Sequence, residues 1–197
     1  MRLAILGGTF DPIHNAHLAI ARAAAERCSL DRVLFVPAAH PPHKNSSLGA
    51  AYEDRFEMVR LACQADPRFE ASRLEEGSGV SYSILTIEKV VAQDRHVFFI
   101  IGADAFAELG TWYRWQDVVR MVEFAVVTRP GTEYAIPPGA RVCPLDGIDL
   151  PVSSSAIREE LAAGRIPAEL PPAVAEYIQE RGLYGFGTAD ADPRSNS

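Results

Sequence analysis

Residues 3–18, LAILGGTFDPIHNAHL, join a short apolar run to an amphipathic segment through two adjacent glycines. The apolar run Leu3–Leu6 predicts a buried strand that ends at Gly7 and Gly8, and residues 14–28 have the apolar spacing of a helix. Two glycines at the end of a strand let the backbone approach a ligand closely. The unpaired N–H groups at the start of the following helix favour an anion. This stretch therefore predicts a strand–turn–helix unit with an anion site at the turn.

The same alternation of apolar runs and amphipathic segments continues along the chain. Further strands are predicted at residues 33–36, 69–74, 97–101, 124–127 and 141–144. Further helices are predicted at residues 52–64, 81–92, 104–109, 115–121, 154–163 and 172–179. Because strands that are apolar throughout and alternate with helices form parallel sheets covered on both faces, we expect a Rossmann-like, doubly wound α/β fold. One domain is expected over residues 1–184, followed by a disordered, polar and acidic tail over 185–197.

The predicted sheet also indicates where a ligand would bind. Doubly wound sheets bind ligands at the carboxyl ends of their strands, near the point where the strand order reverses. The loops after the first, second, fourth and fifth predicted strands should therefore line the site, and most of the unusual residues of the chain fall in these loops.

Composition excludes several classes of protein. The chain has 197 residues, with 19 basic and 26 acidic side chains and a net charge of −7, which argues against a nucleic-acid-binding surface. No stretch approaches the ~18 apolar residues of a membrane span, and the first apolar run is too short for a signal peptide. Three separate cysteines without a CxxC pattern fit reduced thiols. We therefore expect a cytoplasmic protein with neither a nucleic-acid nor a membrane partner.

His14 and His17 are three residues apart, so on a helix they share one face. Two imidazole donors beside a helix start suit a phosphate oxygen, although the stretch is neither a Walker A loop nor a GxGxxG turn. Two other interpretations remain open at this point. The histidines can be ordinary polar residues at a helix start, or zinc ligands, although the other three histidines form no matching ligand pair.

A second segment, VSSSAIR at residues 152–158, also precedes a predicted helix. A serine run is typical of a helix cap, which explains one of the three hydroxyls. The other two, with Arg158 in the first turn, favour a second phosphate site, because an arginine can bind phosphate through two hydrogen bonds. A plain capped helix is the alternative.

These two segments together resemble the signatures of the nucleotidylyltransferase superfamily, and the closer resemblance is to its bacterial nicotinate-nucleotide adenylyltransferases. Between the two signatures, five shorter blocks stand in the order of that family: PPHK at 41–44, SYS at 81–83 with Thr86 following, GAD at 102–104, TWY at 111–113 and RPG at 129–131. The resemblance spans residues 1–184. The chain departs from the family pattern at Ala16, which replaces glycine, and at Ser83 and Ser155, which replace threonine.

The resemblance implies transfer of AMP from ATP to nicotinate mononucleotide, giving nicotinate adenine dinucleotide and pyrophosphate in NAD biosynthesis. It implies Mg²⁺ as the companion of ATP and no metal held by protein ligands. The acceptor phosphate is already anionic at neutral pH, so the reaction needs alignment and charge neutralisation more than a general base.

The resemblance also assigns roles to individual residues. The catalytic set would be His14, His17, Lys44 and Arg158. ATP and its phosphates would be bound by Gly7, Gly8, Thr9, Phe10, Ser154, Ser155 and Asp104, with the loop acting through its backbone amides and Asp104 through the sugar hydroxyls. The nicotinate nucleotide would be bound by Tyr82, Ser83, Trp112 and Arg129.

Three other functions compete with this one. Another small-acceptor nucleotidylyltransferase, such as a phosphopantetheine adenylyltransferase, would share the histidine and serine segments but gives no reason for the PPHK, SYS and Trp112 blocks. A non-catalytic nucleotide-binding module would not need both histidines, Lys44 and Arg158. A metal-dependent hydrolase would require bound zinc.

Overall fold

The structure, a computed structural model, describes residues 1–40, 49–77, 81–92, 96–128, 133–148 and 151–187. Within these ranges the strands are β1 (Arg2–Gly8), β2 (Arg32–Pro37), β3 (Phe69–Ala71), β4 (His96–Gly102), β5 (Glu123–Val127) and β6 (Arg141–Leu145). The α-helices are α1 (Asn15–Arg27), α2 (Tyr52–Cys63), α3 (Ser83–Val91), α4 (Ala103–Ala107), α5 (Trp115–Met121), α6 (Ser154–Ala162) and α7 (Pro172–Arg181). Two short 3₁₀ helices are η1 (Leu109–Thr111) and η2 (Leu183–Gly185).

The six strands form one sheet in the order β3-β2-β1-β4-β5-β6. Every neighbouring pair is parallel; Leu3 in β1, for example, lies opposite Arg32 of β2 on one side and Val97 of β4 on the other. The chain first adds strands to one side of β1 and then crosses over to add β4 on the other side. The predicted doubly wound parallel sheet is therefore confirmed, and its order reverses between β1 and β4.

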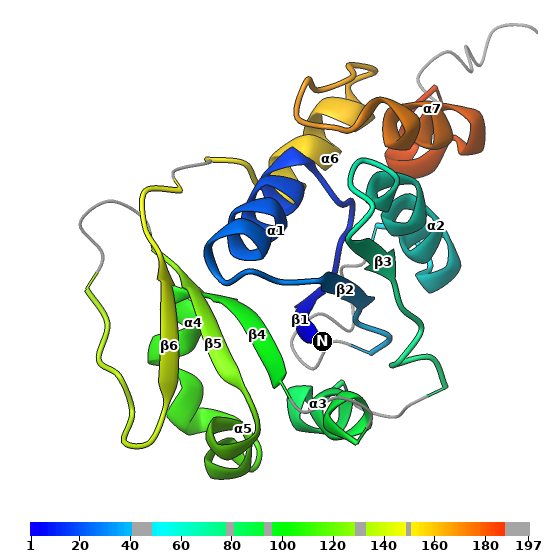
Figure 1. The fold of residues 1–197 in the computed structure, drawn as a ribbon. Coiled ribbons are helices and arrows are strands. Elements are labelled where there is room, and N and C mark those ends of the chain that lie inside the picture. The colour runs from blue at the N-terminus through cyan, green and yellow to red at the C-terminus, as the bar shows by residue number, and fades with distance from the viewer. Residues whose placement is uncertain (41–48, 78–80, 93–95, 129–132, 149–150, 188–197) are drawn as a thin grey trace, which may run out of the picture.

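Helices cover both faces of the sheet (Figure 1), with α1, α2, α6 and α7 on one side and α3, α4 and α5 on the other. Successive residues of each strand serve opposite faces. In β1, Ala4 and Leu6 belong to the hydrophobic core under α1, whereas Leu3 and Ile5 belong to the core against α3. The middle residues of β1, β2, β4 and β5 are apolar because both faces of these strands are buried.

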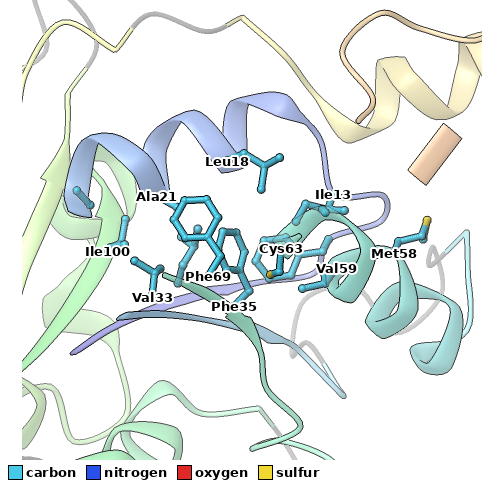
Figure 2. Packing of buried hydrophobic residues seen from close by; sticks show 14 of the residues in the cluster. Ile13, Leu18, Ala21, Val33, Phe35, Met58, Val59, Cys63, Phe69 and Ile100 are labelled. Carbon is cyan, nitrogen blue, oxygen red and sulfur yellow. The ribbon is translucent and has the colours of Figure 1, made fainter. Parts of the chain in front are cut away.

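The core under α1 anchors the first turn of the fold. Leu18 and Ala21 of α1 point toward Phe35 of β2 in Figure 2, and the Phe35 ring lies 5.2 Å from that of Phe69. Leu18, Ala21 and Phe35 are buried. The helix that follows the two glycines is thus fixed against the sheet over its whole length.

Several predicted boundaries are wrong by a few residues. The predicted strand at 69–74 ends at Ala71, and the predicted helix at 81–92 begins at Ser83, because Tyr82 has extended backbone angles. The predicted helix at 104–109 is the short α4 followed by η1, which contains Gly110, a poor helix former.

The described residues also bear on the compartment and tail predictions. No helix in the described part of the chain is long and apolar enough to cross a membrane. Cys28, Cys63 and Cys143 are all free thiols, as expected. The predicted tail falls mostly on residues 188–197, which lie outside the described residues.

Candidate active site

A cavity of about 520 Å³ lies at the carboxyl ends of β1 and β4, at the position predicted from the reversal in strand order. Loops after β1, β2 and β4 contribute to it, as does Val127 at the end of β5. The loop after β3 contributes as well, which the sequence analysis did not predict. The predicted site residues that line this cavity are Gly7, Gly8, His14, His17, Ser83, Asp104, Trp112 and Ser154.

His14 and His17 face the cavity as a stacked pair at the start of α1. Their ring centroids are 3.8 Å apart, with 27° between the ring planes. His14 is the N-cap residue, and its backbone N–H donates to Nδ1 of His17 at 3.2 Å. Because Nδ1 of His17 accepts this bond, the neutral ring carries its proton on Nε2. Sequence spacing predicted the shared face correctly.

Burial keeps both rings neutral at physiological pH. It lowers the pKa of His14 to about 4, an effect partly opposed by the negative charge of Glu169. Burial and, to a smaller extent, the neighbouring His14 lower the pKa of His17 to about 3. Among the described residues, the buried Nδ1 of His14 has no hydrogen-bond partner. The pair therefore offers hydrogen-bonding groups to a ligand without presenting a permanent positive charge.

The turn between β1 and α1 brings its backbone close to the cavity. A Cβ at Gly7 would meet no atom within 4 Å, so this glycine borders open space, whereas a Cβ at Gly8 would lie 3.0 Å from the Phe10 ring. Phe10 has a φ of 49°, a strained value for a non-glycine residue, and its buried ring packs edge-on against His17. Phe10 thus anchors the turn through its side chain, and neither Thr9 nor Phe10 is among the residues that line the cavity.

The serine segment is already engaged in bonds within the protein. Ser153 caps α6 by accepting from the Ala156 amide at 3.1 Å, and its hydroxyl lies 3.1 Å from that of Ser155. The Ser154 hydroxyl donates to the Pro12 carbonyl at 3.0 Å. Ser154 lines the cavity and Ser155 does not. The capped-helix interpretation is correct for Ser153, and Ser154 joins α6 to the β1–α1 turn.

Arg158 is also turned toward the β1–α1 turn. Its Nη1 donates to the backbone carbonyl of Asp11 at 2.7 Å and lies 3.8 Å from the Asp11 carboxylate. Arg158 lies beside the β1–α1 turn, whose backbone amides are the predicted phosphate donors. Its positive charge is therefore close to that turn, although the side chain does not line the cavity.

The cavity lining also contains aromatic side chains. Trp112 lines the cavity and meets the Phe99 ring edge-on, with the centroids 5.9 Å apart. Ser83 lines the cavity at the first position of α3, whereas the exposed Tyr82 ring packs on Tyr113 at 5.0 Å outside it. Two further predicted residues, Lys44 and Arg129, lie outside the described residues.

Sequence reasoning missed a buried group of charges beneath the turn. The Asp11 carboxylate accepts from the amides of Gly49 and Ala50, at 2.7 and 3.0 Å, and from the Tyr184 hydroxyl at 2.9 Å. Arg55 is fully buried and donates to the Thr9 carbonyl at 2.6 Å. Asp11 stands within the opening stretch, but its partners are far away in the sequence, so spacing carried no signal for it.

The position of Arg55 on its helix did carry a signal. The buried side of α2 contains Arg55, Met58, Val59, Ala62 and Cys63. Phe56 is half-buried, and Arg60 on the same helix is exposed. An arginine three and four residues before buried apolar residues lies on the buried side of its helix. Such a position indicates that the arginine has a specific structural role.

Glu75 is a second buried charge that the sequence analysis did not single out. It lines the cavity, is 9% exposed, and accepts from the Thr86 hydroxyl at 2.9 Å and from the Ala39 amide at 3.4 Å. It stands in the charged run Arg73–Glu76, which reads as a solvated surface, so the sequence held no signal for it. Within the described ranges, no group of three or more His, Cys, Asp or Glu side chains is arranged to hold a metal ion.

Comparisons with known proteins agree with this geometry. Residues 5–160 match the model of a family described as cytidylyltransferase-like. A protein of Solibacter usitatus named "Probable nicotinate-nucleotide adenylyltransferase" is 58% identical over 187 residues, which cover 93% of this chain and 100% of that protein. A protein of the same name from Exiguobacterium sibiricum is 43% identical over 188 residues, covering 93% and 99%.

A solved structure shares the fold at much lower sequence identity. The nicotinic acid mononucleotide adenylyltransferase of Plasmodium falciparum, complexed with NaAD, superposes with a TM-score of 0.79 at 18% identity. The superposition covers 95% of this chain and 98% of that one. At this identity the likeness supports the fold alone.

Proposed function

The chain belongs to the nicotinate-nucleotide adenylyltransferases, and we propose that the cavity at the ends of β1 and β4 is where it transfers AMP from ATP to nicotinate mononucleotide. The products are nicotinate adenine dinucleotide and pyrophosphate. The observation that carries this proposal is the stacked pair of neutral histidines at the start of α1, which faces the cavity beside an open glycine turn.

The reaction exchanges one bond at the α-phosphorus of ATP. An oxygen of the acceptor phosphate forms a bond to that phosphorus, and the bond to the pyrophosphate oxygen breaks, with the electron pair leaving on pyrophosphate. The attacking oxygen is already anionic at neutral pH, so no general base is required. The protein must align the two phosphates and stabilise the negative charge that gathers around the α-phosphorus.

His14 and His17 suit this task. In our proposal Nε2–H of His17 donates to an oxygen of the α-phosphate, and His14 lies beside it on the same face. The approach of an anion raises the pKa of an imidazole, so the donors strengthen as charge develops. The amides of Gly8, Thr9 and Phe10, together with the positive end of α1, add donors whose orientation is fixed before the substrate binds.

The serine segment and Arg158 are proposed to contact the β- and γ-phosphates. For this contact the Arg158 guanidinium must exchange its bond to the Asp11 carbonyl for bonds to a phosphate group, two of whose oxygens can accept parallel hydrogen bonds. Lys44 is proposed to join them. Mg²⁺ is proposed to enter with ATP as part of the substrate, held by phosphates and waters.

The acceptor is proposed to bind at the Trp112 end of the cavity. The tryptophan offers an aromatic face of the size of a pyridine ring, and Ser83 supplies a hydroxyl and an amide at the start of α3 for the ring carboxylate. Tyr82 and Arg129 complete this proposed set, and Asp104 is proposed to contact the sugar hydroxyls from the cavity wall.

Pyrophosphate release by the purified protein, with MgATP and one acceptor at a time, tests the proposal. Nicotinate mononucleotide, nicotinamide mononucleotide and phosphopantetheine are the acceptors. We expect release with the first to exceed release with phosphopantetheine by several orders of magnitude. Activity with phosphopantetheine alone would overturn the acceptor assignment, and no release with any acceptor would overturn catalysis.

A further inference from the structure

The segment Ala38–His40 contacts two separate parts of the chain that line the cavity. It leaves the end of β2, and the Ala38 amide donates to the Gly8 carbonyl at 2.8 Å. At its other end, the His40 amide donates to the Ser81 hydroxyl at 3.0 Å, and the Ser81 amide donates to the His40 carbonyl at 3.2 Å. The segment therefore touches both the β1–α1 turn and the chain that leads into α3.

Arg55 joins this segment to the turn. From the buried side of α2, its Nη1 donates to the Thr9 carbonyl at 2.6 Å and its Nη2 donates to the Ala38 carbonyl at 2.9 Å. One rigid, planar guanidinium thus bonds the loops that follow two neighbouring strands. The planar fork fixes both the separation and the relative angle of the two carbonyls, which a single-point cation cannot do.

Glu75 joins the same segment to α3. One carboxylate oxygen accepts from the Ala39 amide, and the other accepts from the hydroxyl of Thr86, a buried residue of α3. The first turn of α3 contains Ser83, which lines the cavity. Glu75 therefore sets the position of the start of α3 relative to Ala39.

We propose that Arg55 and Glu75 are positioning residues that hold Ala38–His40 between the ATP-binding turn and the acceptor-binding start of α3, and so set the spacing between the two reacting phosphates. This inference rests on the proposed function for its catalytic consequence. It goes beyond that function because neither residue belongs to the histidine, serine or tryptophan segments. Arg55 does not line the cavity, and Glu75 lines it with both carboxylate oxygens bonded within the protein, to Ala39 and Thr86.

Hydrogen-bond geometry explains why an arginine and a glutamate serve here in place of apolar side chains. Taking an ion out of water is costly, and an apolar side chain of similar volume often gives equal or better stability. An apolar side chain cannot, however, fix the distance between two backbone groups through hydrogen bonds. A misplacement of about 1 Å between reacting groups can cost about 10²-fold in rate, so the geometric gain is large.

The kinetic test uses Arg55→Met, Arg55→Lys and Glu75→Gln in the full chain. We expect Arg55→Met to lower kcat/KM about 10²-fold, mainly through kcat and the KM for ATP. Arg55→Lys should restore part of this loss, because lysine reaches only one of the two carbonyls. Glu75→Gln should raise the KM for nicotinate mononucleotide about tenfold and leave the KM for ATP within about twofold, because its contacts lie on the α3 side.

Two neighbours provide matched controls. Arg60→Met removes an exposed arginine from the same helix, and Glu76→Gln removes the exposed carboxylate next to Glu75. Both should leave each kinetic constant within about twofold of the wild type, since surface substitutions have small effects. Equal losses in the Arg60 and Arg55 variants would overturn the proposal, as would a Glu75→Gln variant that loses ATP and acceptor binding equally.

Amide hydrogen exchange of the ligand-free protein tests whether Arg55 and Glu75 hold Ala38–His40 in place, and this measurement does not depend on enzyme activity. We expect faster exchange at Ala38 in Arg55→Met and at Ala39 in Glu75→Gln, with core amides of β1 and β4 unchanged. Unchanged exchange at Ala38 and Ala39 would refute the proposal that Arg55 and Glu75 hold this segment in place. Should Arg55→Met fail to fold, Arg55→Lys and Glu75→Gln still decide the question. A wild-type protein that forms no product refutes the proposed function alone, because the exchange result is independent of it.

Discussion

The starts of α1 and α6 look alike in the sequence and differ in the structure. Both follow a strand or loop and begin with polar residues suited to phosphate. At α1 the histidine rings face the cavity, and Nδ1 of His14 has no partner among the described residues. At α6, Ser153 caps the helix, and Ser154 and Arg158 donate to carbonyls of the β1–α1 turn.

The difference separates two uses of a helix start. The α1 end presents unoccupied groups to a ligand, so a change there should alter the reaction and leave the fold intact. The α6 end makes hydrogen bonds that hold the turn in place, so a change there should lower both stability and activity.

Removing the donor of His17 should give the largest effect. In His17→Asn the side-chain oxygen can still accept from the His14 amide, but Nε2–H is lost. We expect kcat to fall about 10²–10³-fold with the melting temperature within about 2 °C of the wild type, since loss of one transition-state donor typically has this cost. Steady-state kinetics and thermal unfolding measure the two. The control is His96→Asn at the exposed start of β4; a variant that keeps half of the wild-type kcat would refute the role of His17.

Arg158 should behave differently, because its bond lies within the protein. We expect Arg158→Met to lower the free energy of unfolding by about 2 kcal/mol, typical of a lost hydrogen bond to a charged group. This corresponds to a fall of about 4–8 °C in melting temperature, accompanied by a higher KM for ATP. Chemical denaturation and ATP titrations measure these effects. Loss of ATP binding with unchanged stability would place α6 in the same class as α1.

Two glycines extend the contrast to the backbone. A Cβ at Gly49 would lie 2.7 Å from the Tyr184 ring and 2.8 Å from Cδ of Arg158, whereas one at Gly7 would meet nothing within 4 Å. Gly49→Ala should therefore destabilise the protein by about 1–3 kcal/mol through overpacking. Gly7→Ala should leave stability unchanged and raise the KM for ATP about tenfold, or about 1.4 kcal/mol, because its methyl group enters the cavity. Gly110→Ala, also without neighbours but outside the cavity, is the control.

The pH dependence of stability should be determined by His14 and His17 at the start of α1. Because the pKa values of His14 and His17 fall to about 4 and about 3 on folding, the unfolded chain binds more protons below its own histidine pKa of about 6.5. Stability should be fully present above pH 6.5 and should fall as the pH drops below it. At pH 5.5 the loss should be about 1.4 kcal/mol for each ring.

Denaturation midpoints between pH 5 and 8 measure this slope in the wild type and two variants. His17→Asn should flatten it by about half, whereas Arg158→Lys, which keeps a cation at this position, should leave the slope unchanged. An unchanged slope in His17→Asn would show that groups other than His17 control the loss of stability at acidic pH.

Short-range patterns predicted the fold and part of the site. The β1–α1 unit, the parallel sheet and the shared face of His14 and His17 all follow from spacing within a few residues. Trp112 and Ser83 reached the cavity as the resemblance implied. Helical spacing places Arg55 on the buried side of α2 but does not identify its partners or those of Glu75, because tertiary contacts set them: Thr9 is 46 residues from Arg55, and Ala39 is 36 residues from Glu75. Arg158 donates to the Asp11 carbonyl, a contact between residues 147 positions apart that short-range spacing does not predict.

The hydrogen bond between Tyr184 and Asp11 has a consequence for how the protein matures during synthesis. Asp11 is among the first residues to leave the ribosome, yet the partners of its carboxylate and carbonyl come from residues 49, 50, 158 and 184. Chains are made at about 5–20 residues per second, so roughly 9–35 seconds separate Asp11 from its last partner. The phosphate-facing turn is thus translated first and completed last, and a nascent chain gains its finished turn only when η2 has emerged.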